Sequence, residues 1–94
     1  MNYFVYICGN ARERYHLSRN LQGSTGTNLL FTTLAEGARS LRGLRVVGYI
    51  VTPYTHHEAK KSSTLGVNLL DMVDVLEHNI ATAVPSHRYL PSYA

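Results

Sequence analysis

The sequence predicts a small two-layer sandwich of the α+β or α/β class, with about three strands and a long C-terminal helix. Three short apolar segments, near residues 2–9, 28–31 and 45–52, carry β-branched or aromatic side chains, a composition typical of strands in a covered sheet. A longer segment, 64–83, repeats its apolar residues at spacings of three and four, which predicts a helix with one continuous apolar face. Strands and helices therefore alternate along the chain, as they do in layered folds.

A chain of 94 residues has the size of one domain, so we take 1–94 as a single domain with an extended C-terminal tail at 85–94. The tail contains Tyr89, Leu90 and Tyr93 and is too apolar for a free end. We expect it to dock on its own domain or on a neighbouring molecule.

The segment after the first strand predicts a helix. Asn10 stands three residues before Glu13, the spacing of a helix start in which the two side chains cap backbone N–H groups. This start predicts a helix over about 11–21. Tyr15 and Leu17 alternate with polar residues, however, which would suit a strand paired with the first one. Both interpretations stay open, and we favour the helix.

A further helix is expected between the second and third strands. Thr33 and Glu36 have the spacing of a capping box. In the helix that they would open, Leu34, Ala38 and Leu41 share one face.

Two glycines and a proline mark the start, the middle and the end of the third strand. Gly43 stands where a left-handed residue commonly ends a helix. Gly48, in the middle of the strand, indicates close packing or a bulge. Pro53 ends the strand, and we expect a polar loop over 54–62.

The long helix is expected to begin at Ser63 or Thr64 and to end before Pro85. We expect its apolar face to pack on the sheet, and the face is wide enough to meet a second copy as well. That face consists of Leu65, Leu69, Met72, Val73, Leu76, Ile80 and Ala83.

Composition favours a cytoplasmic protein that does not enter a membrane. Cys8 is the single cysteine, and its apolar neighbours favour a small buried hydrophobe over a reactive thiol. The longest apolar run is far shorter than the roughly 18 residues that a membrane span needs, and no charged leader precedes it.

The charge pattern is lopsided. Residues 1–61 hold eight of the nine Lys and Arg against three acids, a net charge of +5, whereas residues 62–94 hold one Arg against three acids, a net charge of −2. Seven of the nine basic residues are Arg, whose planar fork prefers phosphate and carboxylate groups.

This pattern predicts an anion-binding surface made by arginines and tyrosines from separate segments. Tyrosine adds a flat face on which a base can stack. The candidate residues are Arg12, Arg14, Arg19, Arg39, Arg42, Arg45, Tyr15 and Tyr54.

The acidic row in the long helix has two interpretations. Asp71, Asp74 and Glu77 are spaced by three residues and lie roughly on one side. The row is either a solvated face or an electrostatic partner for a basic patch on another subunit.

No catalytic motif stands out, and we expect no catalytic residue, no cofactor and no metal. The loop at 23–27 has small residues but lacks the lysine of a phosphate-binding loop, so we take it as a flexible turn. His56, His57, Asp74 and His78 are competent metal ligands, but their spacing matches no metal-binding signature.

The sequence therefore favours a small non-catalytic binding or regulatory protein that engages an anionic partner: nucleic acid, a nucleotide-type ligand or an acidic protein surface. An alternative is a self-assembling module, or an inhibitor of a host protein, that uses the long helix and the tail. A third interpretation is a small metal-dependent enzyme. The charged fraction of 16% with an apolar fraction of 45% also favours a homo-oligomer, because apolar surface would then be buried between subunits.

Overall fold

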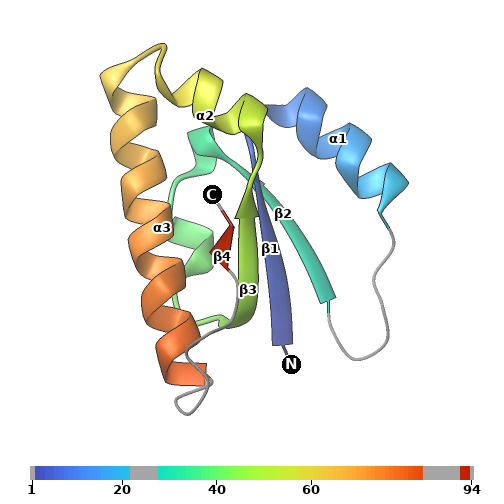
Figure 1. Cartoon of the computed structure of the whole chain (residues 1–94), viewed down its shortest axis with the longest axis vertical. Helices are drawn as coiled ribbons and strands as arrows, with labels where there is room; N and C mark the ends of the chain where they lie inside the picture. The colour runs from blue at the N-terminus through green and yellow to red at the C-terminus, as the bar shows by residue number, and fades with distance from the viewer. Residues whose placement is uncertain (1, 22–27, 84–91, 94) are drawn as a thin grey trace.

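The computed structural model describes residues 2–21, 28–83 and 92–93. Its sheet has four strands in the order β2-β1-β3-β4, and every neighbouring pair is parallel (Figure 1). The strands are β1 (Asn2–Cys8), β2 (Asn28–Thr33), β3 (Arg45–Val51) and β4 (Ser92–Tyr93). The three predicted strands and the mixed sheet-and-helix class are confirmed.

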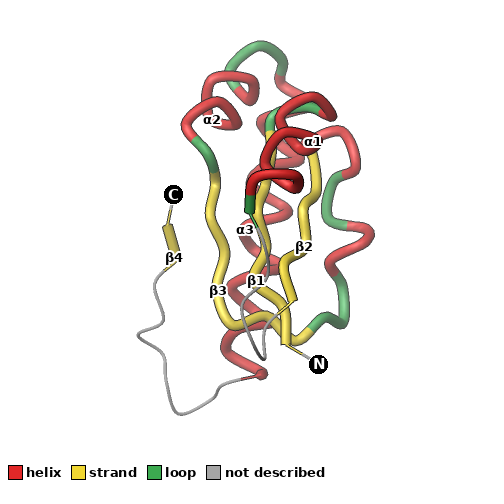
Figure 2. The backbone as a smooth tube through the Cα atoms, turned by 90° about the vertical axis from the view of Figure 1, so that its right-hand side faces the viewer, coloured by secondary structure: helices red, strands yellow, loops and turns green. Residues whose placement is uncertain are grey.

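Helices lie on both faces of this sheet. Figure 2 shows α1 in front of the sheet, near the carboxyl ends of β1 and β2, with α3 behind it. Two short 3₁₀ turns, η1 and η2, lie on the α3 side and contact that helix. The helical elements are α1 (Ala11–Asn20), η1 (Leu34–Glu36), η2 (Arg39–Leu41), α2 (Pro53–Ala59) and α3 (Ser63–Ala83).

The core lies between the sheet and α3. Val5 and Ile7 of β1 alternate onto one face, where they cluster with Val46 of β3 and with Met72 and Leu76 of α3. All five side chains are fully buried. Burial of a side chain of this size stabilises the fold by about 1.5–3 kcal/mol, so this cluster is a main source of stability.

The predicted apolar face of α3 is confirmed over the described side chains. Met72, Leu76 and Ile80 are buried, and the other members from Leu65 to Val73 are partly buried against the core. The side chain of Ala83 lies outside the described residues.

The helix expected after Thr33 is not an α-helix. Gly37 adopts a φ of +67°, a left-handed conformation that interrupts helical hydrogen bonding and leaves the two 3₁₀ turns η1 and η2. Leu34, Ala38 and Leu41 are nevertheless buried, as the pattern predicted.

The prediction of a polar loop over 54–62 is wrong for residues 54–59, because residues 53–59 form the helix α2. Thr52 caps this helix and Pro53 occupies its first turn, a start that the sequence Thr-Pro-x-Thr encodes.

The predicted roles of Gly43 and Gly48 agree with the structure. Gly43 has a φ of +80° and ends the turn after η2. The register between β1 and β3 shifts at Tyr3 and Phe4, opposite Val46 and Gly48, which marks a bulge beside Gly48.

Part of the predicted tail is also described. Ser92 and Tyr93 form β4, which pairs with β3 opposite Tyr49 and Ile50, so this part of the tail docks on its own sheet. The rest of the tail and the loop at 23–27 lie outside the described residues.

Candidate functional site

The strand order places a crevice at the carboxyl ends of β1 and β3. The connection from β1 through α1 leads to β2 on one side, whereas β3 pairs with β1 on the other side. In open parallel sheets, ligands bind where the connections diverge in this way, outside the carboxyl ends of the strands. Here Gly9 and Asn10 follow β1, and Thr52 and Pro53 follow β3.

The first wall of the crevice is the start of α1. The Glu13 N–H donates to Asn10 Oδ1 at 2.9 Å, and Glu13 Oε1 accepts from the Gly9 N–H at 2.8 Å. These two bonds form the cap that Asn10 and Glu13 predicted, and the helix interpretation of 11–21 is confirmed over Ala11–Asn20.

The second wall is the start of α2, and it is tied to the first. Thr52 Oγ1 accepts from the Thr55 N–H at 3.1 Å and contacts Glu13 Oε1 at 2.9 Å. Thr55 Oγ1 donates to the carbonyl of Ile7 at 2.6 Å and lies 2.7 Å from Thr52 Oγ1. The two hydroxyl groups thus link α1, α2 and the end of β1 in one buried network.

A hollow of about 210 Å³ opens above this network. Asn10 Nδ2, at the start of α1, donates to the Tyr54 hydroxyl at 2.9 Å and so holds the Tyr54 ring of α2 in place. The absence of a side chain at Gly9 makes room for that ring, because a Cβ there would stand 2.6 Å from Tyr54 Cδ2. The lining residues are Asn10, Arg12, Glu13, His16 and Tyr54.

The outward side of α1 continues from this hollow as a basic stripe. Arg12, Tyr15, His16 and Arg19 recur at spacings of three and four and are all exposed. The Arg19 guanidinium lies over the Tyr15 ring, 5.5 Å from its centre, and donates to its hydroxyl at 2.8 Å. Within the described chain, no ion pair or hydrogen bond engages the Arg12 guanidinium. We call Arg12, Tyr15, His16, Arg19 and Tyr54 the α1 basic surface.

Arg14 belongs to the structural side of the same helix. It is half-buried and pairs with Glu36 of η1, so this bond joins α1 to the segment after β2. The charge of Arg14 is therefore already paired within the fold.

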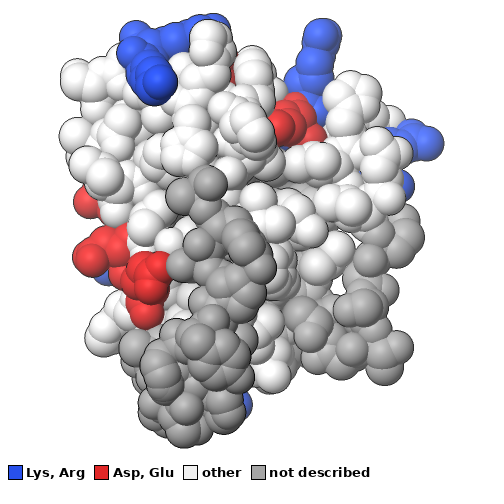
Figure 3. Space-filling view, viewed as in Figure 1, with Lys and Arg blue, Asp and Glu red and all other residues white. Residues whose placement is uncertain are grey.

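The other three predicted arginines lie apart from α1. Arg39 and Arg42 are exposed on and after η2, and Arg45 is exposed at the amino end of β3, the end opposite the crevice. Figure 3 agrees, because Lys and Arg occupy separate places on that view rather than one patch. The structure thus joins Arg12, Arg19, Tyr15 and Tyr54 but not the whole predicted set.

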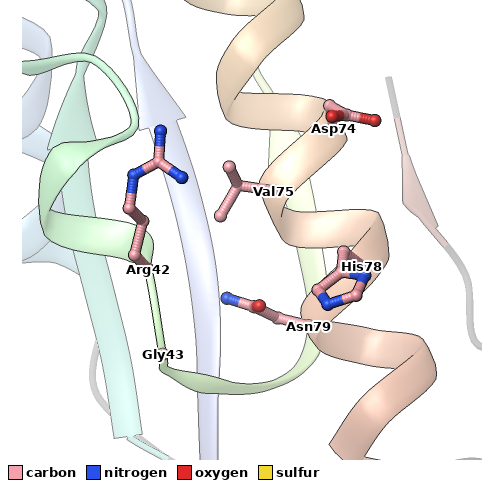
Figure 4. Close-up of a pocket in the computed structure, with 6 residues that line it drawn as sticks. All are labelled: Arg42, Gly43, Asp74, Val75, His78 and Asn79. Atoms are coloured by element: carbon pink, nitrogen blue, oxygen red, sulfur yellow. The ribbon is translucent and has the colours of Figure 1, made fainter.

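Arg42 lines a second hollow of about 330 Å³, between the turn at Gly43 and α3. Figure 4 shows Arg42 and Asn79 pointing into the space beside Val75, whereas the Asp74 carboxylate points away from it. Asn79 Nδ2 donates to the Leu41 carbonyl at 2.7 Å, so its amide serves to hold η2 on the helix.

Two titrating groups near the crevice have shifted pKa values. Burial, reinforced by the Glu13 carboxylate, raises the pKa of the Cys8 thiol from 9.0 to about 12, so the buried sulfur stays protonated. On α2, the hydrogen bond from Lys61 lowers the pKa of Glu58, with Lys61 Nζ 2.7 Å from Glu58 Oε2.

The candidate metal ligands divide between two helices, with His56 and His57 on α2 and Asp74 and His78 on α3. Within residues 2–21, 28–83 and 92–93, no three His, Cys, Asp or Glu side chains are placed to hold a metal ion.

Sequence reasoning missed His16 and the role of α2 in the site. His16 falls one helical turn after Arg12, so the helix interpretation of 11–21 would have placed the two together. The start of α2 was encoded by Thr52 and Pro53, but the segment was interpreted as a loop.

Fold and crevice together define a small parallel α/β protein with an open crevice at the divergence of its strand connections. Comparisons with protein-family models, with curated proteins and with solved structures gave no match for this chain. In the described part of the chain, no helix has the length and apolar character to span a membrane.

Proposed function

We propose that this chain is a small non-catalytic binding module that holds an anionic group of its partner on the α1 basic surface. One observation carries the proposal: the Arg12 guanidinium is exposed, has no partner within the described residues, and lines the same hollow as Tyr54. An unengaged guanidinium in a concave site offers several donors in a fixed fork, the geometry that suits a carboxylate or phosphate group.

The surroundings of Arg12 support the same role. The carboxylate of Glu13 is the acid in the hollow wall, and its Oε1 already accepts from Gly9 and contacts Thr52. These hydrogen bonds stabilise the Glu13 carboxylate and reduce its repulsion of an incoming anion. The exposed stripe of α1 adds Arg19 and contains no acid, while Tyr54 offers a ring and a hydroxyl beside the hollow.

A binding role also agrees with the state of the cysteine. The Cys8 thiol is buried and its pKa of about 12 keeps it protonated, so it is a poor nucleophile. A single buried, reduced cysteine is typical of cytoplasmic proteins, and we place the protein there.

The test compares Arg12→Gln with a matched control, Arg45→Gln, at the opposite end of β3. Four probes separate the partner classes: inorganic phosphate and adenosine monophosphate by calorimetry, and a labelled single-stranded oligonucleotide and a labelled Glu-rich peptide by fluorescence anisotropy. For at least one probe, Arg12→Gln should weaken binding about tenfold or more, the loss expected for one charge-assisted fork, and Arg45→Gln should change it less than about twofold.

The double variant Arg39→Ala/Arg42→Ala gives the opposing outcome. If it weakens binding while Arg12→Gln does not, the anion binds beside the second hollow and the proposal is wrong. Binding of all four probes that is indifferent to Arg12→Gln contradicts it as well.

A further inference from the structure

The large exposed hydrophobic side chains of the described chain fall into two groups. Tyr15 (55% exposed) and Tyr54 (38%) belong to the α1 basic surface. Val67 (55%) and Leu70 (72%) stand on the outward side of α3. A side chain as exposed as Leu70 contributes nothing to its own core, and paired with a neighbour of similar exposure it can anchor a contact with another molecule.

The outward side of α3 is acidic, whereas the exposed stripe of α1 is basic. The helix carries three carboxylates and no Lys or Arg. Glu77 accepts from the Tyr49 hydroxyl at 2.7 Å, whereas Asp71 and Asp74 have no ion-pair partner within the described residues. Figure 4 shows the Asp74 carboxylate directed away from Arg42 and from the second hollow. We call Val67, Leu70, Asp71 and Asp74 the α3 acidic surface; their spacings of three and four place them on one side of the helix.

The two surfaces lie on opposite sides of the molecule. In Figure 1 the sheet separates α3 from α1. In Figure 3 a group of Asp and Glu lies over α3, whereas the Lys and Arg over α1 have an acidic group beside them. One molecule can therefore present its basic surface to a neighbour on one side and its acidic surface to another neighbour on the other side.

From this complementarity we infer that the anionic partner of the α1 basic surface is the α3 acidic surface of a second copy of this chain. The inference rests on the proposed function and names its partner. Asp71 and Asp74 of one copy supply carboxylates to Arg12 and Arg19 of the next, and Leu70 packs against the flat face of Tyr15.

The charges also fix the symmetry of this contact. A two-fold contact of α1 on α1 would oppose arginines to arginines, and one of α3 on α3 would oppose carboxylates to carboxylates. Like charges across an interface are unfavourable, so the copies associate head to tail. A head-to-tail contact repeats, and it builds a ring if the rotation closes or a filament if it does not.

Sedimentation velocity on the full chain over a series of concentrations tests the inference. Two variants each lose one surface: Asp71→Asn/Asp74→Asn removes the acids, and Arg12→Gln/Arg19→Gln removes the cations. All four side chains are exposed. Circular dichroism and thermal unfolding serve as the check that both variants fold.

We expect the mass of the unaltered protein to rise with concentration, and about 0.5 M salt to reverse the association by screening. Each variant alone should associate about tenfold more weakly, because its contact lacks two ion pairs. An equal mixture of the two variants contains one intact surface of each kind, so it should form dimers and nothing larger.

Three results would overturn the inference: an unaltered protein that stays monomeric at every concentration, variants that associate as the unaltered protein does, or a mixture no larger than its components. A different readout, probe binding, decides whether the proposed function is wrong. If Arg12→Gln abolishes probe binding while Asp71→Asn/Asp74→Asn leaves the mass unchanged, the second copy is the wrong partner and the basic surface remains a binding site. If Arg12→Gln leaves every probe bound, the binding site itself is wrong.

Discussion

Replacing Cys8 by alanine should make the protein less stable near neutral pH and more stable at high pH. The pKa of the thiol is 9.0 ordinarily and about 12 in the fold. Between these values the unfolded chain loses the thiol proton while the folded chain keeps it, so the unfolded state binds fewer protons and stability falls as pH rises. Below pH 9 the cost is absent. It amounts to about 1 kcal/mol at pH 10 and roughly 3 kcal/mol at pH 11, since each unit of pKa difference corresponds to about 1.36 kcal/mol.

Cys8→Ala abolishes this cost because alanine does not titrate. The substitution removes one buried sulfur, for which we expect a constant loss of about 1 kcal/mol. The unaltered protein should therefore be the more stable of the two at pH 8, the two should be equal near pH 10, and the variant should be the more stable at pH 11. All other groups are the same in both proteins, so their contributions cancel in the difference.

Urea denaturation of both proteins, followed by circular dichroism at each pH, measures this difference. A gap between the two free energies of unfolding that stays constant from pH 8 to pH 11 would refute the reasoning. It would mean that the thiol ionises as easily in the fold as in the unfolded chain, and hence that the end of β1 is open to water.

Three further substitutions, with Leu70→Ala as their control, test the fold and the crevice. Leu76→Ala, in the closed core, should cost about 2–5 kcal/mol in urea denaturation, whereas Leu70→Ala on the same helix should cost less than about 0.5 kcal/mol; equal losses would mean that α3 presents a different face to the sheet. Glu13→Ala should cost about 2 kcal/mol, because it removes the cap of α1 and its bond across to α2, and a loss no larger than that of Leu70→Ala would contradict the network. Gly9→Ala should leave the melting temperature almost unchanged, since Tyr54 can swing into solvent, yet weaken probe binding about as much as Arg12→Gln; unchanged binding would show that the ring does not shape the hollow.

Local sequence patterns were sufficient for most of the fold. The apolar run at 3–8 and the spacing of three and four in α3 depend on neighbours along the chain, and both elements formed where these patterns placed them. The helix expected after Thr33 failed because Gly37 takes a left-handed conformation, and Glu36 is drawn to a guanidinium on α1 that lies far away in the sequence. Such a contact is decided by tertiary structure.

The site was predictable only in part, for the same reason. The sequence identified the arginines, and it correctly placed Arg12 on a helix. It could not show that Arg14 turns inward to an ion pair while Arg12 turns outward, since that choice depends on which side of α1 meets the sheet. Strand order, which separates Arg45 from the crevice, is equally absent from local patterns.

The most direct test of the site is a titration of the ¹⁵N-labelled protein with adenosine monophosphate and, separately, inorganic phosphate, followed by amide chemical shifts. If an anion enters between the starts of α1 and α2, the amides of Gly9, Asn10 and Arg12 shift together and saturate at one affinity. A binding site at the carboxyl ends of β1 and β3 would be contradicted by chemical-shift changes confined to Arg42 and Gly43. It would also be contradicted if the amides of Gly9, Asn10 and Arg12 did not shift at saturation.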